Sequence, residues 1–202
     1  MHSLFAMGIG HQKTKQASFI NFNWKHQLSH GGELRKKQLG RKQRPLSTKE
    51  PIHVVFKVHK LRLRHKSLRT SKNFQISYKI IGKYSKYFSV KVEQFSIQPD
   101  HIHLLVRSSR RKNLHHFFRV VAGQIAQSLE KVKLLTDVTD TPLAPNGLWK
   151  YRPFSRVVRG WKAYNTVRNY IQLNEKEATG EIRYQKKRLR GLSNADWQIL
   201  WS

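Results

Sequence analysis

The sequence contains no cysteine and few acidic residues: 11 of its 202 residues are Asp or Glu. The absence of cysteine excludes a disulfide framework, a thiolate zinc site and a cysteine nucleophile. No run reaches the roughly 18 consecutive apolar residues of a membrane span, and the N-terminal MHSLFAMGIG is too short and too mixed for a signal peptide. We therefore expect a cytoplasmic protein without membrane association.

Positive charge and aromatic rings are both abundant. The 40 Lys and Arg residues give a formal net charge of +29, which repels itself strongly unless a polyanion is close. Nucleic acid is the commonest polyanion, and a ribosome-associated or membrane-surface protein is the alternative. The 5 Trp, 7 Tyr and 10 Phe are too many for a fully disordered polycation. We therefore expect a compact basic domain.

Composition along the chain divides it into three parts. Residues 1–50 have little periodicity and carry the run RKKQLGRKQR (35–44), which predicts a flexible basic arm that grips phosphates, or else a dispensable extension. Residues 51–180 hold the periodic segments of a folded domain. Residues 181–202 form a basic and then aromatic C-terminal tail.

Hydrophobic patterning predicts an alternation of strands and helices within 51–180. Strands are expected over 52–58, 88–97, 101–106 and 154–158, and helices over part of 59–87, over 114–132 and over 161–178. Asn113 is the expected N-cap of the second helix, and Gly180 the terminator of the third. This order fits an α+β, ferredoxin-like antiparallel sheet packed with helices.

The most specific local pattern is His101-Ile102-His103 in an expected strand. Because side chains alternate along a strand, both imidazoles project from one face while Ile102 packs on the other. Two adjacent imidazoles can supply two ligands to a divalent metal. In a chain with 11 histidines such a pair also arises by chance.

Tyr170 and Asn174 lie one turn apart on the same face of an expected helix. A phenol beside a metal suits phosphoryl transfer through a covalent phosphotyrosine, although a free phenol with pKa ~10 needs a nearby cation to become a nucleophile. The alternative is that Tyr170 is simply a core residue. Tyr164 is a rival nucleophile, but it faces a different direction on the helix and has no amide one turn later.

The acidic residues are too scattered for carboxylate catalysis. None lies between Glu50 and Glu93, and none between Asp140 and Glu175. Two-metal nucleases need several carboxylates that converge on the metals, so that class is disfavoured.

The segment QPDHIHLLV (98–106) resembles the signature strand of the single-tyrosine HUH transposases, whose name stands for His-hydrophobic-His. WKYRPFSRVVRG (149–160), followed by VRNYIQLNEKEATG (167–180), resembles the region around the catalytic tyrosine. The REP-associated tyrosine transposase (RAYT) branch is the most similar, and the resemblance covers about 52–180.

This resemblance implies a ferredoxin-like fold and a transposase that cleaves and rejoins single-stranded or hairpin DNA. It makes His101, His103 and Asn174 the ligands of Mg²⁺ or Mn²⁺, and Tyr170 the nucleophile of a 5′-phosphotyrosine intermediate. It also implies a nucleoid-associated monomer or homodimer.

The sequence departs from the family pattern in three places that keep alternatives open. Ala178-Thr179-Gly180 stands where Ala-Gly-Leu is usual. Glu175 follows Asn174 where the family has proline, and Asp100 precedes His101 where asparagine is usual. A domesticated or unrelated nucleic-acid-binding protein without strand transfer is therefore the alternative. A two-histidine phosphoesterase would need a second His-x-Thr/Ser motif, which His53 and His65 do not supply.

Several basic clusters are candidates for phosphate contacts in a DNA interface. They are Lys57, Lys60, Arg62 and Arg64 after the first strand, Arg107, Arg110, Arg111 and Lys112 after the histidine strand, Arg119 on the second helix, and Arg156 and Arg159 around the last strand.

Overall fold

The computed structural model describes residues 45–136 and 147–202. Four strands form one antiparallel sheet in the order β2-β3-β1-β4: β1 (Ile52–Lys57), β2 (Lys91–Ile97), β3 (His101–Arg107) and β4 (Phe154–Val157). The helices are α3 (Ser71–Tyr87), α4 (Arg111–Lys131), α5 (Trp161–Thr179) and α6 (Asn194–Trp201), with short 3-10 helices η1 (Lys60–Arg62) and η2 (Arg188–Gly191). The order and pairing confirm the α+β, ferredoxin-like expectation.

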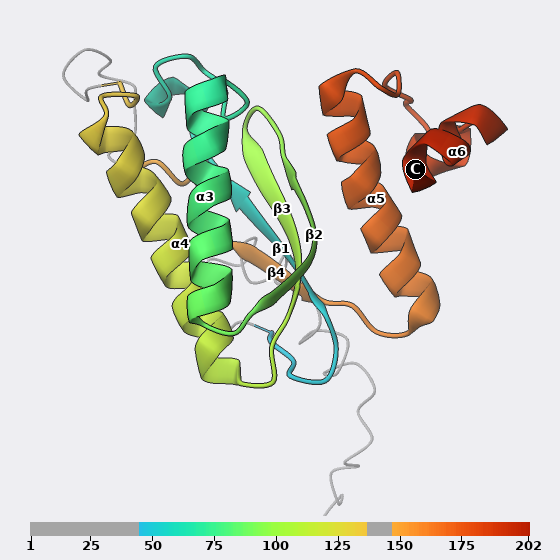
Figure 1. Ribbon diagram of the computed structural model, residues 1–202, viewed down its shortest axis with the longest axis horizontal. Helices are drawn as coiled ribbons and strands as arrows, with labels where there is room; N and C mark the ends of the chain where they lie inside the picture. The colour runs from blue at the N-terminus through green and yellow to red at the C-terminus, as the bar shows by residue number, and fades with distance from the viewer. Residues whose placement is uncertain (1–44, 137–146) are drawn as a thin grey trace, which may run out of the picture.

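Helices cover both faces of the sheet. Figure 1 shows α3 and α4 side by side on one face, and α5 with α6 on the other. Every second residue of β3 (Ile102, Leu104 and Val106) is buried in the main core with the apolar face of α4. The residues between them (His101, His103 and Leu105) face α5 instead. The alternation expected for the histidine strand is confirmed.

Helix α5 is fixed to the sheet by a small apolar cluster. Val167 and Ile171 pack on Leu105 of β3 and on Val158 just after β4. The helix ends at Gly180, which takes the left-handed conformation with φ 83°. Burying this cluster sets the face that α5 turns towards the sheet.

Residues 181–202, expected as a basic and aromatic tail, fold against α5. Ile182 and Leu200 are buried with Leu173 of α5. Helix α6 starts with a capping box in which Ser193 and Asp196 each accept a hydrogen bond from the other's backbone N–H. This segment therefore brings its basic run close to the α5 helix.

Three local expectations need correction. Helix α4 begins at Arg111 with Arg110 as its N-cap residue, so Asn113 lies within the first turn and is not the cap. Strand β2 begins at Lys91, because Phe88 is the C-cap of α3 and Ser89 has φ 50°. Most of the expected basic arm (1–44) lies outside the described residues, and residues 45–50 contact the domain: Leu46 is buried and the carbonyl of Pro45 accepts a hydrogen bond from Ser155.

None of the helices in the described part of the chain is long and apolar enough to span a bilayer.

The core between the sheet and α4 predicts a large cost for removing one ring. Phe118 is 1% exposed and meets the Phe56 ring edge-on at 6.4 Å. Phe118→Ala should lower the free energy of unfolding by about 3–5 kcal/mol, because the cavity cannot collapse fully. Urea denaturation followed by circular dichroism measures this. Arg119→Ala, an exposed neighbour, should change stability by less than about 0.5 kcal/mol; similar losses for both variants would contradict the packing.

Candidate active site

The hairpin between β2 and β3 holds the histidine pair at one end of the sheet. Pro99 and Asp100 form its turn, and the carbonyl of Asp100 accepts a hydrogen bond from Val58 N–H just after β1. The rings of His101 and His103 lie 4.6 Å apart with their planes at 88°. Both imidazoles therefore lie side by side on the face that α5 covers.

Asp100 anchors the outer histidine. Its Oδ1 lies 2.6 Å from His101 Nδ1, and Lys57 and Lys60 lie 3.8 and 4.0 Å from Oδ2. Burial raises the pKa of the Asp100 carboxyl, but the hydrogen bond and charge of His101, with the two lysines, outweigh burial and hold that pKa below its usual value. The ionised carboxylate favours hydrogen on His101 Nδ1, which leaves Nε2 as the basic nitrogen.

A third histidine, His53 of β1, completes the cluster. Its ring stacks on His103 with centroids 5.2 Å apart, and its Nε2 lies 3.0 Å from His103 Nδ1. His53 was not among the site residues predicted from the sequence, where it was noted only as not supplying a phosphoesterase motif. The available signal was the alternation in β1, which puts His53 on the face opposite Ile52 and Val54, and the antiparallel pairing of β1 with β3 completes the placement.

Burial keeps the two inner imidazoles neutral. Burial and the charge of Arg156 lower the pKa of His53 to about 4. Burial and the charges of His53, His101 and Arg188 lower the pKa of His103 to about 2. His103 Nε2 is buried without a hydrogen-bond partner. A neutral imidazole has a free lone pair, so this nitrogen is suited to ligate a cation.

Tyr170 contacts the histidine cluster from α5. Its ring meets that of His103 edge-on at a centroid distance of 5.6 Å, and the guanidinium of Arg188 lies 5.4 Å from its centre. Tyr164 lies elsewhere, stacked on Trp161 at 5.6 Å with Arg107 over its ring. Of the two tyrosines, Tyr170 is therefore the one beside the histidines.

Asn174 is buried one turn after Tyr170, and two of its polar groups form hydrogen bonds. Its Oδ1 accepts a hydrogen bond from Arg188, its carbonyl accepts one from Gln98 at 2.7 Å, and its Nδ2 is buried without a partner. Arg188 also binds Glu177 at 2.7 Å. Arg188 was expected only as part of a basic tail, because no local pattern links it to a helix that ends nine residues earlier.

Comparison with known proteins identifies the family. The sequence model described as "Transposase IS200 like" matches residues 48–174, a segment that contains the histidine pair, Tyr170 and Asn174. The chain belongs to the IS200-like transposase family. No curated protein matches the transposase chain.

Two solved structures are similar to this transposase, and the first of them shares its fold. The structure described as the REP-associated tyrosine transposase bound to a REP hairpin matches with a TM-score of 0.52 and 13% identity, over 71% of this chain and 76% of that one. A candidate transposase from Deinococcus radiodurans matches with a TM-score of 0.44 and 16% identity, over 67% of this chain and 98% of that one.

The site of the transposase opens into a basic pocket of about 360 Å³ between α5 and η2. Its lining includes His53, Tyr170, Arg156, Lys187, Arg188 and Arg190. Of the basic residues expected at a DNA interface, Arg156 lines this pocket, and Lys57 and Lys60 lie beside His101 through Asp100.

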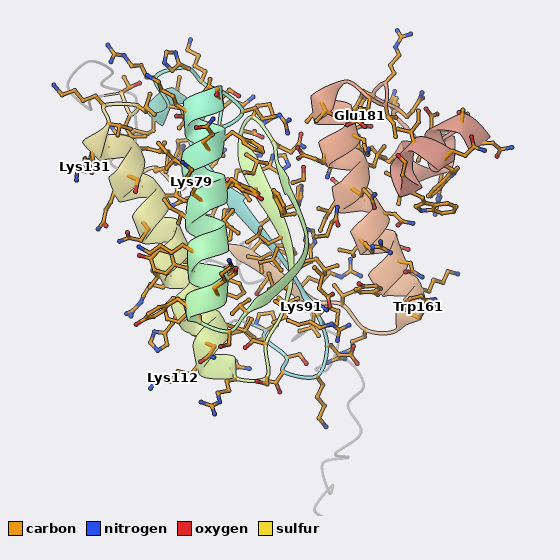
Figure 2. The ribbon with its side chains drawn as sticks, viewed as in Figure 1. Lys79, Lys91, Lys112, Lys131, Trp161 and Glu181 are labelled. Atoms are coloured by element: carbon orange, nitrogen blue, oxygen red, sulfur yellow. The ribbon has the colours of Figure 1, made fainter. Side chains whose placement is uncertain are left out.

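The other residues expected to contact DNA lie farther from the histidine cluster or bind other groups within the domain. Arg110, Arg111 and Lys112 lie where β3 has ended and α4 begins, and Figure 2 shows Lys112 at the opposite end of the molecule from Glu181. Several others bind within the domain: Arg64 to the carbonyl of Lys133, Arg111 to that of Leu46, and Arg107 to Glu93 and the carbonyl of Lys49. Arg119 and Arg159 are exposed.

Arg62 is a correction to the sequence-based interface. It is only 6% exposed, and its guanidinium binds the carbonyl of Thr136 at 2.5 Å. Its burial makes it a structural link between η1 and the segment after α4, because a buried guanidinium cannot reach a phosphate.

Arg188 predicts a specific weakness in the transposase. Arg188→Gln removes both bonds to Glu177 and leaves that carboxylate, which is 10% exposed, without its charged partner, at a cost of about 1–3 kcal/mol. Hydrogen exchange over 188–201 should therefore become faster. Arg190→Gln, an exposed neighbour, should leave exchange unchanged; equal protection in both variants would contradict the role of the ion pair.

Proposed function

We propose that this transposase cleaves and rejoins single-stranded or hairpin DNA through a 5′-phosphotyrosine intermediate at Tyr170, with Mg²⁺ or Mn²⁺ bound by His101 and His103. The observation that carries the proposal is the contact of Tyr170 with His103, at 5.6 Å between ring centroids. The phenol and the histidine pair come from separate elements, and the fold brings the Tyr170 ring into contact with His103.

The chemical step is an exchange of esters at phosphorus. Tyr170 Oη loses its proton and attacks a backbone phosphate, forming a bond to phosphorus. The bond to the 3′ oxygen breaks, and that oxygen leaves as a hydroxyl after taking up a proton. The 5′ phosphate stays on tyrosine, so the reverse reaction with a different 3′ hydroxyl rejoins DNA. The guanidinium of Arg188, 5.4 Å from the ring centre, favours the negative charge that the phenol develops.

The two motif histidines fit a divalent cation. His103 Nε2 is buried without a partner, and Asp100 favours hydrogen on His101 Nδ1, so both Nε2 atoms present lone pairs. When bound, the cation would polarise the scissile phosphate. Within the described ranges no group of three or more His, Cys, Asp or Glu residues could hold a metal, so a third protein ligand must be of another type.

Asn174 is the proposed third ligand, and it requires a rearrangement. Its Oδ1 accepts a hydrogen bond from Arg188 in this structure. The guanidinium occupies one of the two lone pairs of this amide oxygen, and its positive charge repels a cation that would bind at the other. Arg188 would therefore have to release Asn174 when the cation binds.

His53 determines which nitrogen of His103 is free. A cation on His103 Nε2 requires hydrogen on Nδ1, and the hydrogen-bond partner of Nδ1 in the described part of the chain is His53 Nε2, at 3.0 Å. His53 must then accept, which it does only as a neutral ring, and burial with the charge of Arg156 lowers its pKa to about 4. His53 is thus the proposed positioning residue of His103.

The partner proposed for the pocket is DNA. Arg156, Lys187 and Arg190 line it, and cations of this kind bind phosphates without sequence preference. The solved REP-associated relative that shares the fold is described as bound to a REP hairpin, which favours hairpin DNA as the substrate and the RAYT branch as the subfamily. Action as a monomer or a homodimer stays a prediction.

Tyr170→Phe should abolish covalent attachment to DNA. The purified protein, with Mn²⁺ or Mg²⁺ and a labelled hairpin oligonucleotide, should give an adduct that survives denaturing electrophoresis, because the phosphotyrosine bond is covalent. The variant lacks only the nucleophilic oxygen, so its DNA affinity should be nearly unchanged. Tyr164→Phe is the matched control and should keep the adduct. An adduct from Tyr170→Phe would show that another residue is the nucleophile. DNA binding without any adduct in the wild type would favour the alternative of a binding protein without strand transfer.

Single substitutions in the histidine cluster should weaken metal binding to different degrees. His101→Ala and His103→Ala should each abolish Mn²⁺ binding at the site, measured by titration with electron paramagnetic resonance. His53→Phe keeps the stacked ring but removes the acceptor, so the affinity should fall roughly 10–100-fold. His65→Ala, an exposed histidine outside the site, is the control. Unchanged Mn²⁺ affinity in His103→Ala would contradict the proposed ligands.

A further inference from the structure

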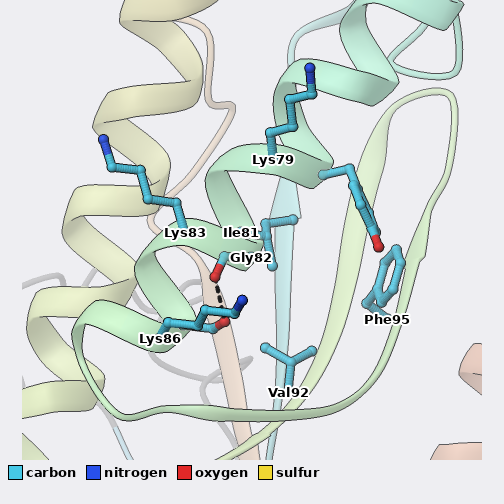
Figure 3. Close-up of a pocket in the computed structure, with 9 residues that line it drawn as sticks. Lys79, Ile81, Gly82, Lys83, Lys86, Val92 and Phe95 are labelled. Carbon is cyan, nitrogen blue, oxygen red and sulfur yellow. Dashed lines mark hydrogen bonds between the residues drawn. The ribbon is translucent and has the colours of Figure 1, made fainter.

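A groove of about 430 Å³ lies between α3 and the edge strand β2, away from Tyr170. Helix α3 covers the face of the sheet opposite α5 (Figure 1), so this groove and the tyrosine pocket lie on different faces of the molecule. Figure 3 shows Ile81 of α3 and Val92 and Phe95 of β2 among the side chains that line the groove. Its size is in the range of ligand sites, which run from roughly 300 to 1,000 Å³.

An aromatic ring is held half in solvent at the rim of this groove. Tyr78 is 53% exposed, yet its ring lies parallel to Phe74, at 6.2 Å and 7°, and packs against Phe95 at 5.7 Å. Two aromatic partners contact the ring, and about half of the side chain stays accessible to solvent. An ordered, exposed ring of this kind is a platform on which a nucleobase can stack.

The charge around the groove has one sign. Helix α3 contains no acidic residue, and Lys79, Lys83 and Lys86 line the groove and are exposed. None of the three forms an ion pair within the described part of the chain. Glu93 of β2, the nearest acid in sequence, is bound to Arg107. An anion that enters the groove therefore meets lysines without competing carboxylates.

Gly82 keeps one wall of the groove open. It lies in the middle of α3, where glycine weakens a helix relative to alanine. A Cβ there would meet no atom within 4 Å, so packing within the chain does not require glycine. A glycine in a helix interior without a packing reason is consistent with the close approach of a ligand to the backbone.

We infer that the groove between α3 and β2 binds a single-stranded segment of nucleic acid, with one base stacked on Tyr78 and its phosphates beside Lys79 and Lys86. The inference rests on the proposed DNA substrate and adds a second contact surface to it. A second copy of this chain is disfavoured as the occupant because its own lysine-rich face would repel this one. Unpaired bases next to a hairpin supply both the flat apolar ring and the negative charge that the groove accepts.

The test compares two oligonucleotides with the full-length chain. Fluorescence anisotropy at one fixed salt concentration measures affinity for a hairpin with a single-stranded extension and for the same hairpin without it. Tyr78→Ala, Lys86→Gln and Gly82→Leu should each weaken binding of the extended hairpin, roughly tenfold for Tyr78→Ala, and leave the bare hairpin nearly unchanged. Tyr87→Ala and Lys72→Gln lie on the same helix outside the groove lining and are the controls. Equal affinities of the groove variants and the wild type for the extended hairpin would overturn the inference.

Three further measurements distinguish a filled groove from a damaged helix, locate the bound DNA and test for self-association. Gly82→Leu should unfold at a temperature no lower than the wild type, so that its weaker binding reports a filled groove and not a damaged helix. With 5-iodouracil in the extension, photocrosslinks should map to the peptide that contains Tyr78 or Phe95, and crosslinks only elsewhere would contradict the site. Light scattering should give the same mass for the wild type and Tyr78→Ala; a dimer in the wild type that this variant dissolves would assign the groove to self-association.

The test of the groove can succeed or fail independently of the test of the proposed function. At saturating DNA the groove variants should form as much Tyr170 adduct as the wild type, because the reacting groups are intact. Loss of the adduct in Tyr170→Phe with normal groove binding supports both claims. A wild type that forms no adduct but prefers the extended hairpin through Tyr78 would overturn the strand-transfer proposal and keep the groove.

Discussion

The site depends on the side-chain alternation of one buried strand. In β3, Ile102, Leu104 and Val106 enter the main core, and this commits His101, His103 and Leu105 to the opposite face. Leu105 then packs with Val167 and Ile171, which fixes α5 over the histidines. A shift of one residue in register would bury both imidazoles in the apolar core and remove the contact that positions Tyr170. The hydrophobic core and the reactive groups are therefore set by the same register.

Segments from outside this core tune the chemistry of the site. His53 contacts His103 from the neighbouring strand, Asp100 holds His101 from the hairpin turn, and Arg188 reaches Tyr170 and Asn174 from the C-terminal segment. Together they decide which nitrogens carry hydrogen and where positive charge lies. The site is thus built from strands β1 and β3, from helix α5, and from one returning segment that binds through hydrogen bonds and an ion pair.

Local sequence patterns predicted the site residues that lie close together within one strand or one helix turn. The histidine pair depends on period-two alternation, and Tyr170 with Asn174 depends on one turn of a helix, so both could be read from a few consecutive residues. His53 could not, because its contact with His103 joins residues 50 apart and requires the β1–β3 register. Arg62 was wrongly assigned to the surface for a related reason: a basic run gives no sign of which arginine bonds to a carbonyl 74 residues away. The α+β fold was predictable because the order of its strands and helices leaves few ways to close an antiparallel sheet.

The central claim is that the phenol beside the histidine cluster is the nucleophile. Mass spectrometry of the trypsin-digested DNA adduct of the wild-type protein tests it most directly. Cleavage after Arg168 and Lys176 releases a peptide whose only tyrosine is Tyr170, whereas Tyr164 lies in the preceding peptide. If Tyr170 is the nucleophile, the nucleotide phosphate is expected on residues 169–176. A nucleotide on the peptide of Tyr164, or on any other peptide, would contradict it.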